Sequence, residues 1–224
     1  MNYKIINDEL ALKKFIEWLP ELKDDESYFC LLLSRNKYKP IKDGKKQCQI
    51  KKFTCHKKEL LFQKIQQLEV KVGTYKNNGL DVEQNSLVLY IHPNPRNLIK
   101  ATESSVNILS KYLKQSYFGY NPHKVVLKEI QKSCSRTIFK DFDFDNVDIE
   151  VTKLKLDSIL NRDSYTIVKT KNGFHLLVEE EKISEEFKKN YYPKLSTLEG
   201  CDIKGDNLLP VIGCCQGDFT PYFY

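Results

Sequence analysis

Three aspartates alternate with phenylalanines near residue 140. Residues 137–145 read TIFKDFDFD, and this alternation of polar and apolar residues predicts a β-strand. Since strand side chains alternate between two faces, Asp141, Asp143 and Asp145 share one face, about 7 Å apart, and the phenylalanines bury on the other. Carboxylates in such a row repel one another unless a cation neutralises them, and oxygen-coordinating divalent cations do so. The strand therefore predicts a metal site, with a solvated acidic strand edge as the alternative.

A histidine follows about 30 residues later, in a predicted hairpin. Two strand-like runs, 165–170 and 174–178, are joined by the turn-forming sequence Lys171-Asn172-Gly173. His175 therefore lies just inside a strand, from which its imidazole can reach into a cleft. A lone histidine is more often a hydrogen-bonded core residue, but beside an acidic strand it can hold a phosphate.

A third segment, near the C-terminal end of the sequence, combines charge with glycine. Asp202 and Lys204 alternate onto one face of a short predicted strand. Gly205, Gly213 and Gly217 permit close approach of the backbone to a ligand, as phosphate-binding loops require. Ordinary turns joining C-terminal strands are the alternative interpretation.

The rest of the chain supplies helices and strands that would position these segments. Asp8 begins a helical pattern that Pro20 ends, and Thr54 is expected to cap a second helix. Helices and strands are intermixed, which indicates an α/β or α+β fold built on a mixed sheet. Further strands are expected at 28–33, 86–91, 201–203 and 208–212, and further helices at 98–113, 123–131, 150–160 and 184–195.

Composition excludes several classes of protein. The 224 residues are 41% hydrophobic and 29% charged, which favours a packed core over disorder. No apolar run reaches about 18 residues and the first residues lack a signal-peptide core, so we expect a cytoplasmic protein with no membrane partner. The net charge of +6 is uneven, because residues 35–76 hold 13 Lys and Arg against 3 Asp and Glu. Such a block suits a nucleic-acid backbone, although lysine-rich solvated faces are common.

Seven cysteines occur without any C-x-x-C pair. This odd number and spacing do not indicate a disulfide scaffold or a four-cysteine zinc site, so we expect reduced thiols. Cys48, Cys55 and His56 form at most part of a metal site, since a fourth ligand is not evident.

The order and spacing of the three segments resemble the archaeo-eukaryotic primase superfamily of primase-polymerases, over residues 86–218. The family's Asp-x-Asp motif resembles Asp143-Phe144-Asp145, or the register Asp141-Phe142-Asp143, and its glycine-histidine motif resembles residues 170–175. Its third aspartate resembles Asp202, followed by a proline-containing loop, and its upstream Asn-Pro-Arg resembles residues 94–96. Thr170 and Lys171 stand where the family usually has Ser-Gly, which leaves the phosphate contacts of that turn open.

The resemblance implies a stand-alone nucleotidyltransferase core that adds nucleotides to a nucleic-acid chain. Its fold would have two lobes, an N-terminal α/β lobe over 1–120 and an RRM-like catalytic lobe over 121–224. Its partners would be single-stranded or primed DNA, nucleoside triphosphates and, since no helicase domain accompanies the motifs, a separate helicase. Two cations, Mg²⁺ or Mn²⁺, would be held by Asp141, Asp143, Asp145 and Asp202. Phosphates would be held by His175, as by the family histidine, with Thr170 and Gly173 of the same motif. From their charge and position rather than from the resemblance, we expect Lys171 and Lys204 to contact phosphates, and Arg96, Lys51 and Lys52 to hold nucleic acid.

Three other functions stay open. Asp-x-Asp also opens the haloacid dehalogenase phosphatases, but there Gly-Thr follows, whereas Asn146-Val147 follows here. A glycosyltransferase with an Asp-x-Asp motif is a second alternative. A catalytically inactive nucleic-acid-binding protein of replication or defence, with the same fold, is the third.

Overall fold

The computed structural model describes residues 1–40, 46–113 and 121–224, and its fold is mixed α+β with several antiparallel sheets. Every strand pairing among these residues is antiparallel, so the expected mixed sheet is wrong for the described chain. Two five-stranded sheets dominate the structure, and a two-stranded ribbon of β3 (Lys76–Asn77) and β4 (Leu80–Asp81) accompanies them.

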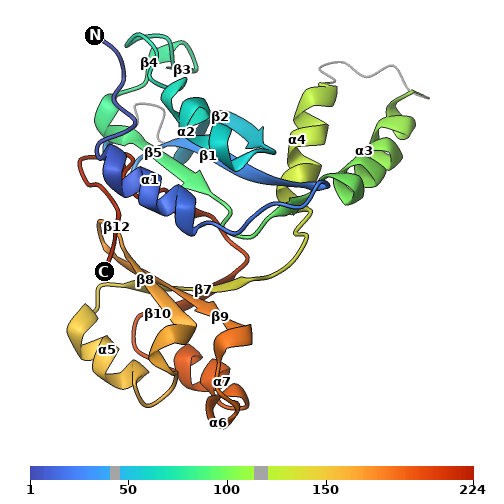
Figure 1. The fold of residues 1–224 in the computed structure, drawn as a ribbon. Helices are drawn as coiled ribbons and strands as arrows, with labels where there is room; N and C mark the ends of the chain where they lie inside the picture. The colour runs from blue at the N-terminus through green and yellow to red at the C-terminus, as the bar shows by residue number, and fades with distance from the viewer. Residues whose placement is uncertain (41–45, 114–120) are drawn as a thin grey trace.

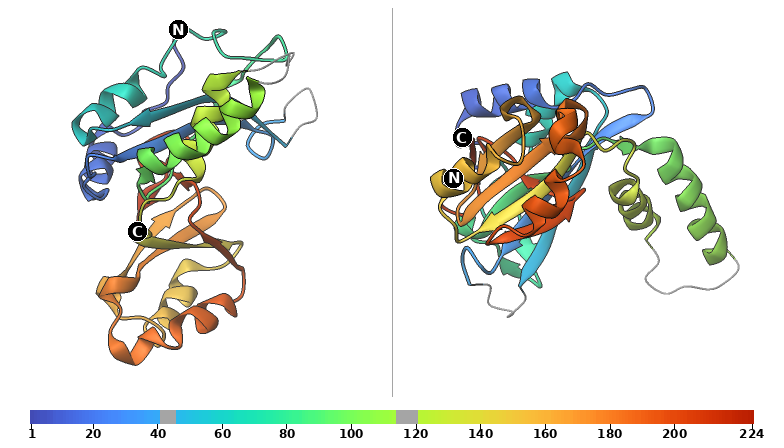
Figure 2. Two further views of the ribbon diagram at one scale, coloured as in Figure 1. Left: turned by 90° about the vertical axis from the view of Figure 1, so that its right-hand side faces the viewer. Right: turned by 90° about the horizontal axis from the view of Figure 1, so that it is seen from below.

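The first sheet is formed largely by the N-terminal part of the chain. Its strands are in the order β11-β5-β1-β2, and β6 pairs with the beginning of β1. Helices α1 and α2 pack against one another, and α3 and α4 form a second pair beside the sheet (Figures 1 and 2). The elements are α1 (Glu9–Trp18), β1 (Glu26–Arg35), β2 (Gln47–Cys55), α2 (Leu61–Gln66), β5 (Leu87–Ile91), β6 (Arg96–Asn97), α3 (Leu98–Tyr112), α4 (Pro122–Lys132) and β11 (Leu209–Pro210).

The second sheet has the order β10-β7-β9-β8-β12. Apart from the last strand, its elements follow one another as strand, helix, strand, strand, helices, strand. The helices all lie on the side of this sheet that faces away from the first sheet (Figure 1). The elements are β7 (Phe139–Asp145), α5 (Ile149–Leu156), β8 (Tyr165–Lys169), β9 (Gly173–Glu179), α6 (Glu185–Lys188), α7 (Tyr191–Ser196), β10 (Cys201–Gly205) and β12 (Tyr222–Phe223).

Alternation along β7 divides its side chains between two environments. Phe142 and Phe144 are fully buried in the cluster beneath α5 and α7, with Leu156 and Leu195. On the opposite face, Phe139 stacks on Trp18 of α1, with ring centroids 4.6 Å apart. The face that carries the three aspartates is therefore turned toward the first sheet.

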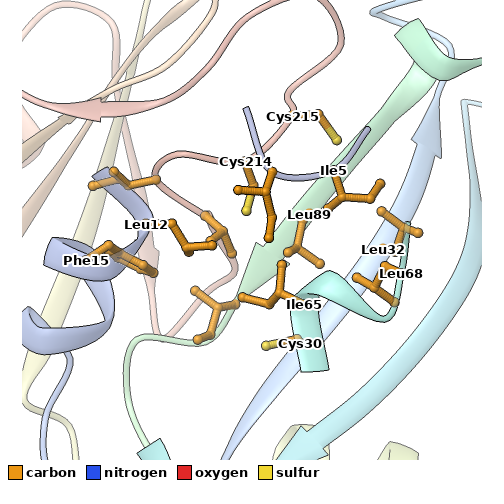
Figure 3. Packing of buried hydrophobic residues seen from close by; sticks show 14 of the residues in the cluster. Ile5, Leu12, Phe15, Cys30, Leu32, Ile65, Leu68, Leu89, Cys214 and Cys215 are labelled. Carbon is orange, nitrogen blue, oxygen red and sulfur yellow. The ribbon is translucent and has the colours of Figure 1, made fainter. Parts of the chain in front are cut away.

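The C-terminal part of the chain returns to the first sheet after β10. Leu209 and Pro210 pair with β5, and Cys214 and Cys215 pack in the core with Ile5 (Figure 3). The first sheet therefore has strands from both sides of residue 120, where we predicted the boundary between two lobes. The reason is that β5 needs a neighbour on its free side, and β11 supplies it.

A buried turn after β5 ties the two sheets together. The side chain of Asn94 donates to the backbone oxygen of Phe139 and accepts the amides of Ile138 and Phe139, all at 2.9 Å. Arg96 is 1% exposed and forms a two-pronged ion pair with Asp206, which follows β10. This turn therefore fixes the beginning of β7 and the end of β10 relative to β5.

The position of Arg96 corrects its predicted role on nucleic acid. Its guanidinium donates to the backbone oxygens of Asn94 and Gln131 as well as to Asp206, and it has almost no exposed surface. All of its donor groups are engaged inside the protein, so Arg96 stabilises the fold rather than holding a template.

The secondary structure differs from the expected pattern in two places. Residues 47–55 form strand β2, so Thr54 lies in a strand and caps no helix. Lysines at the exposed edge of a sheet conceal the alternation that would otherwise identify such a strand. The helix expected at 184–195 is instead two short helices, α6 and α7. Part of the loop expected at 37–46 lies outside the described residues.

Across the described residues, no helix is long and apolar enough to cross a membrane.

Buried His92 makes the stability of this fold dependent on pH. Burial, and to a smaller extent the charge of Arg96, lowers the pKa of His92 from an ordinary 6.5 to about 4, although the charge of Asp206 opposes the shift. The unfolded chain therefore takes up a proton near pH 6.5 that the folded chain resists until about pH 4. Stability is present above pH 6.5 and falls as the pH drops through this window, by roughly 3 kcal/mol in all.

Urea unfolding between pH 7 and pH 4 measures this loss. His92→Gln is expected to flatten the pH dependence, and His123→Gln, at an exposed histidine of α4, is expected to leave it unchanged. Equal pH dependence in wild type and His92→Gln would contradict the assignment.

Candidate functional site

Three predicted site residues lie side by side on adjacent strands. Asp143 of β7 is the direct partner of Asp202 on β10 and of His175 on β9. Direct partners in an antiparallel pair share a face and have Cβ atoms about 4.5–5.5 Å apart. The row Asp202–Asp143–His175 therefore crosses the sheet on the face turned toward the first sheet.

The three aspartates of β7 differ sharply in exposure. Asp141 is 1% exposed, the side chain of Asp143 is 19% exposed, and Asp145 lies at the exposed end of the strand. Asp143 and Asp145 line a pocket of about 660 Å³ between the two sheets, together with His175 and Lys204. Asp141 lies beneath this pocket, which indicates a supporting position.

The imidazole of His175 is held from below by Asp141. Its Nδ1 lies 2.8 Å from Oδ1 of Asp141, and its Nε2 lies 3.6 Å from Oδ1 of Asp143. Burial alone would lower the pKa of His175, but the charge and hydrogen bond of Asp141 outweigh it and raise the pKa, with help from Asp143. The raised pKa makes the cationic form more populated than in a free histidine at the same pH. In that form Nδ1–H donates to Asp141 and Nε2–H faces Asp143 at the pocket.

The pKa of Asp143 is raised by its surroundings. Burial raises its pKa, and the like charges of Asp145 and Asp141 raise it further, whereas His175 and Lys204 lower it. Lys204 lies 4.0 Å from Asp143 and forms an ion pair with Asp202. A carboxylate with a raised pKa among other carboxylates is a group that an added cation would stabilise.

The opposite wall of the pocket comes from the first sheet and is basic. Arg35, Lys37 and Lys52 line it, and burial together with the charge of Arg35 lowers the pKa of Lys37. We did not single out Arg35 or Lys37 from the sequence. Both residues follow Leu31 and Leu33 at every second position, and side chains spaced in this way lie on one face of a strand. This spacing is the signal that could have identified Arg35 and Lys37.

The turn between β8 and β9 contributes fewer contacts than predicted. Thr170 lines the pocket, and so does Asn172, which we did not predict. Lys171 instead forms an ion pair with Asp218 and lies over the ring of Tyr38. Gly173 pairs with Asp145 in the sheet, which indicates a structural role.

Gly173 admits no side chain. An added Cβ would lie 1.8 Å from the carbonyl oxygen of Phe144, so β7 would have to move. We expect Gly173→Ala to lower the free energy of unfolding by about 3 kcal/mol, measured by urea denaturation. Gly205→Ala is the control, since its Cβ would meet no atom within 4 Å and its φ of 63° alone is strained. That variant should lose only about 1 kcal/mol, and an equal loss in both would contradict the steric argument.

Other predicted residues lie away from the pocket. Lys51 pairs with Leu32, whose side chain is in the core on the other face of the first sheet, so Lys51 does not line the site. Gly213 packs closely against the beginning of α1, where an added Cβ would lie 2.5 Å from the carbonyl oxygen of Asp8. Its conformation therefore serves packing rather than a phosphate.

The carboxylates fit a divalent cation in type, but a full cage is not formed. Within residues 1–40, 46–113 and 121–224, no three His, Cys, Asp or Glu side chains gather as a metal-binding group. Asp141 is turned to His175, although its Oδ2 is buried without a hydrogen-bond partner. Asp143 and Asp202 remain as a facing pair, and Mg²⁺ in phosphate-transfer sites takes one or two carboxylates together with substrate phosphates.

Cys48, Cys55 and His56 do not form a second metal site in the described structure. The thiol of Cys48 lies 3.1 Å from the side-chain oxygen of Asn77, and that of Cys55 donates to the backbone oxygen of Lys57. Local hydrogen bonds therefore account for both thiols.

Comparison of the chain with protein-family models, curated proteins and solved structures finds no match. The function must therefore be inferred from the geometry of the site itself.

Proposed function

We propose that this protein is a metal-dependent nucleotidyltransferase of the primase-polymerase type, which adds nucleotides to a templated nucleic-acid chain. The observation that carries the proposal is the row Asp202–Asp143–His175, contributed by three adjacent strands. It joins two facing carboxylates to an imidazole. Asp143 and His175 line one side of a pocket whose other side is basic, whereas Asp202, beside Asp143, has a side chain that is 67% exposed and lies outside the pocket lining.

The topology of the second sheet supports this proposal. Four of its strands and their helices follow the β-α-β-β-α-β order of ferredoxin-like and RRM-like units, with the strand order β10-β7-β9-β8. The aspartate and histidine motifs then occupy the two central strands, and Asp202 occupies the neighbouring edge strand. The first sheet, with its basic wall, would be the second lobe of a primase-like core.

The charges of the pocket suit a nucleoside triphosphate. Nε2–H of His175 and the ammonium groups of Lys204 and Lys37 would bind phosphate oxygens, since charge-assisted hydrogen bonds to phosphate are strong. Asp143 and Asp202 would hold Mg²⁺ or Mn²⁺, which in such sites lowers the pKa of the attacking hydroxyl and offsets the charge of the leaving pyrophosphate. Asp141 would keep the imidazole oriented and protonated. All seven cysteines are free thiols, which suits the reducing cytoplasm as the place of action.

Lys204 favours a second candidate function. Its ion pair with Asp202, close to Asp143, already neutralises part of the acidic row. A protein that binds nucleic acid without catalysis would need no cation there.

Extension of a labelled primer on a single-stranded template separates the two functions. We expect incorporation of deoxynucleotides or ribonucleotides by the wild-type protein in Mn²⁺ or Mg²⁺, and none in EDTA. Binding of the primed template without any incorporation, under all of these conditions, would favour the non-catalytic function.

A further inference from the structure

A second basic groove lies beside the candidate site, between β2 and α4. It has a volume of about 880 Å³, and Lys52, Lys124, Lys128 and Lys132 contribute to its lining. The three lysines of α4 recur every fourth residue, so they lie on one face of the helix with about 6 Å of rise between successive residues. This arrangement is a row of cations along one wall of a groove.

Most of this positive charge is not neutralised within the protein. In the described part of the chain, Lys132 is paired with Glu129, whereas Lys52, Lys124 and Lys128 form no ion pair with a carboxylate. Burial and the nearby charge of Lys128 lower the pKa of Lys52. Among the residues that the structure describes, none of those lining the groove is acidic, so the groove would attract an anion.

A buried histidine forms part of the wall of this groove. His92 lines the groove and is 5% exposed, yet neither of its ring nitrogens has a hydrogen-bond partner. The nearest carboxylate oxygen, on Asp206, lies 3.9 Å from Nδ1, too far for a hydrogen bond. Both ring nitrogens are buried as well, so the imidazole forms part of the groove wall, and the lysines supply the charge that a ligand would meet.

The groove is continuous with the pocket that holds Asp143. Gln49, Lys52 and Gln131 line both spaces. A polymer that passes the aspartates can therefore continue between β2 and α4, where Ile50 and Leu127 supply apolar surface between the cations.

We propose that this groove, named here the α4 groove, binds the sugar-phosphate backbone of a single-stranded nucleic acid that extends from the candidate site. Lys124 and Lys128 would each neutralise one phosphate, and Lys52 would contact the strand where the pocket and the groove meet. The assignment of this strand as a polymerase substrate rests on the proposed function, whereas the binding itself does not.

The salt dependence of oligonucleotide binding tests the α4 groove. Fluorescence anisotropy with a labelled 20-nucleotide single strand, between 50 and 300 mM NaCl, gives the slope of log K against log salt. On a single strand, each phosphate that a side chain no longer neutralises reduces the steepness of this slope by about 0.7. We expect the double variant Lys124→Gln/Lys128→Gln to reduce it by about 1.4 and to weaken binding roughly tenfold near 100 mM salt.

Two matched variants isolate the position of the charges. Lys188→Gln/Lys189→Gln removes the same charge at exposed positions beyond the second sheet, and should leave the slope close to that of wild type. Lys124→Arg/Lys128→Arg keeps the charge and should retain the wild-type slope. Urea unfolding checks that all variants are folded. A slope in Lys124→Gln/Lys128→Gln equal to that in the Lys188/Lys189 control, or a change confined to a 20-base-pair duplex, would overturn the proposal.

This test fails separately from the proposed function. A reduced slope in a protein that incorporates no nucleotide would support the α4 groove and contradict the polymerase. Nucleotide incorporation by the wild-type protein, together with a wild-type slope in Lys124→Gln/Lys128→Gln, would support the polymerase and contradict the α4 groove.

Discussion

Asp143→Asn is expected to lower template-dependent nucleotide incorporation at least about 1000-fold. Asp143 is central in the row of site residues, and its carboxylate is the one that faces Asp202 across the strands. Loss of its charge would remove a cation ligand, and a 1000-fold loss corresponds to about 4 kcal/mol of transition-state stabilisation. Primer extension under single-turnover conditions measures this loss.

The same substitution should not harm the fold. Burial and neighbouring carboxylates raise the pKa of Asp143, so the folded protein disfavours its charge, and the neutral isostere should leave the urea midpoint unchanged or raise it. A large loss of activity with unimpaired stability is the pattern expected of a residue that acts on the substrate.

Asp145→Asn is the matched control on the same strand. Asp145 lies at the exposed end of β7, so we expect a loss of no more than about tenfold, close to 1.4 kcal/mol. Such a result would identify Asp141-Phe142-Asp143 as the register of the motif. Equal losses of activity in Asp143→Asn and Asp145→Asn would contradict the larger role that we assign to Asp143.

Arg96→Met is expected to lower the free energy of unfolding by about 3–5 kcal/mol, the largest stability effect that we predict. Its guanidinium is buried and pairs with Asp206 through two nitrogens. Although burial alone would raise the pKa of Asp206, Arg96 holds that pKa below its ordinary value. Removal of one partner from a buried ion pair leaves an uncompensated charge, which costs far more than the pair itself contributes. Urea denaturation at pH 7 gives the change.

A double-mutant cycle separates the effect of the ion pair from the effect of side-chain packing. Arg96→Met/Asp206→Asn removes both charges, so we expect it to recover a substantial part of the stability that Arg96→Met loses. Additive losses in the double variant would show that the two side chains do not depend on each other. A wild-type urea midpoint for Arg96→Met would show that the buried contacts contribute nothing.

The three central strands of the second sheet, β7, β8 and β9, were predictable because their sequence patterns are strong, whereas β12 was not predicted. The alternation of Asp141 with Phe142 identified β7, and Lys171-Asn172-Gly173 identified the hairpin of β8 and β9. The facing of Asp143 and Asp202 depends on register between distant segments, which no local pattern specifies. It was expected only through the resemblance to primase-polymerases.

Residues with a charge were hardest to assign from sequence. Charge alone does not distinguish Arg96, which is buried in the turn between the sheets, from Lys52, which lines both the pocket and the α4 groove. The decisive difference is a partner more than a hundred residues away, Asp206, which only the folded chain brings to Arg96. Similarly, β2 escaped prediction because its lysines reflect its edge position.

The return of the chain to β5 has a consequence for synthesis on the ribosome. The isolated bridge between Ile6 and Cys214 and the pairing of β11 with β5 join early segments of the chain to segments about 120 to 210 residues later. A nascent chain that has just completed β7 therefore lacks one neighbour of β5 and exposes apolar surface around Leu89. Contacts of such long sequence separation slow folding. The first sheet, although most of it is translated early, would close only after β11 has left the exit tunnel.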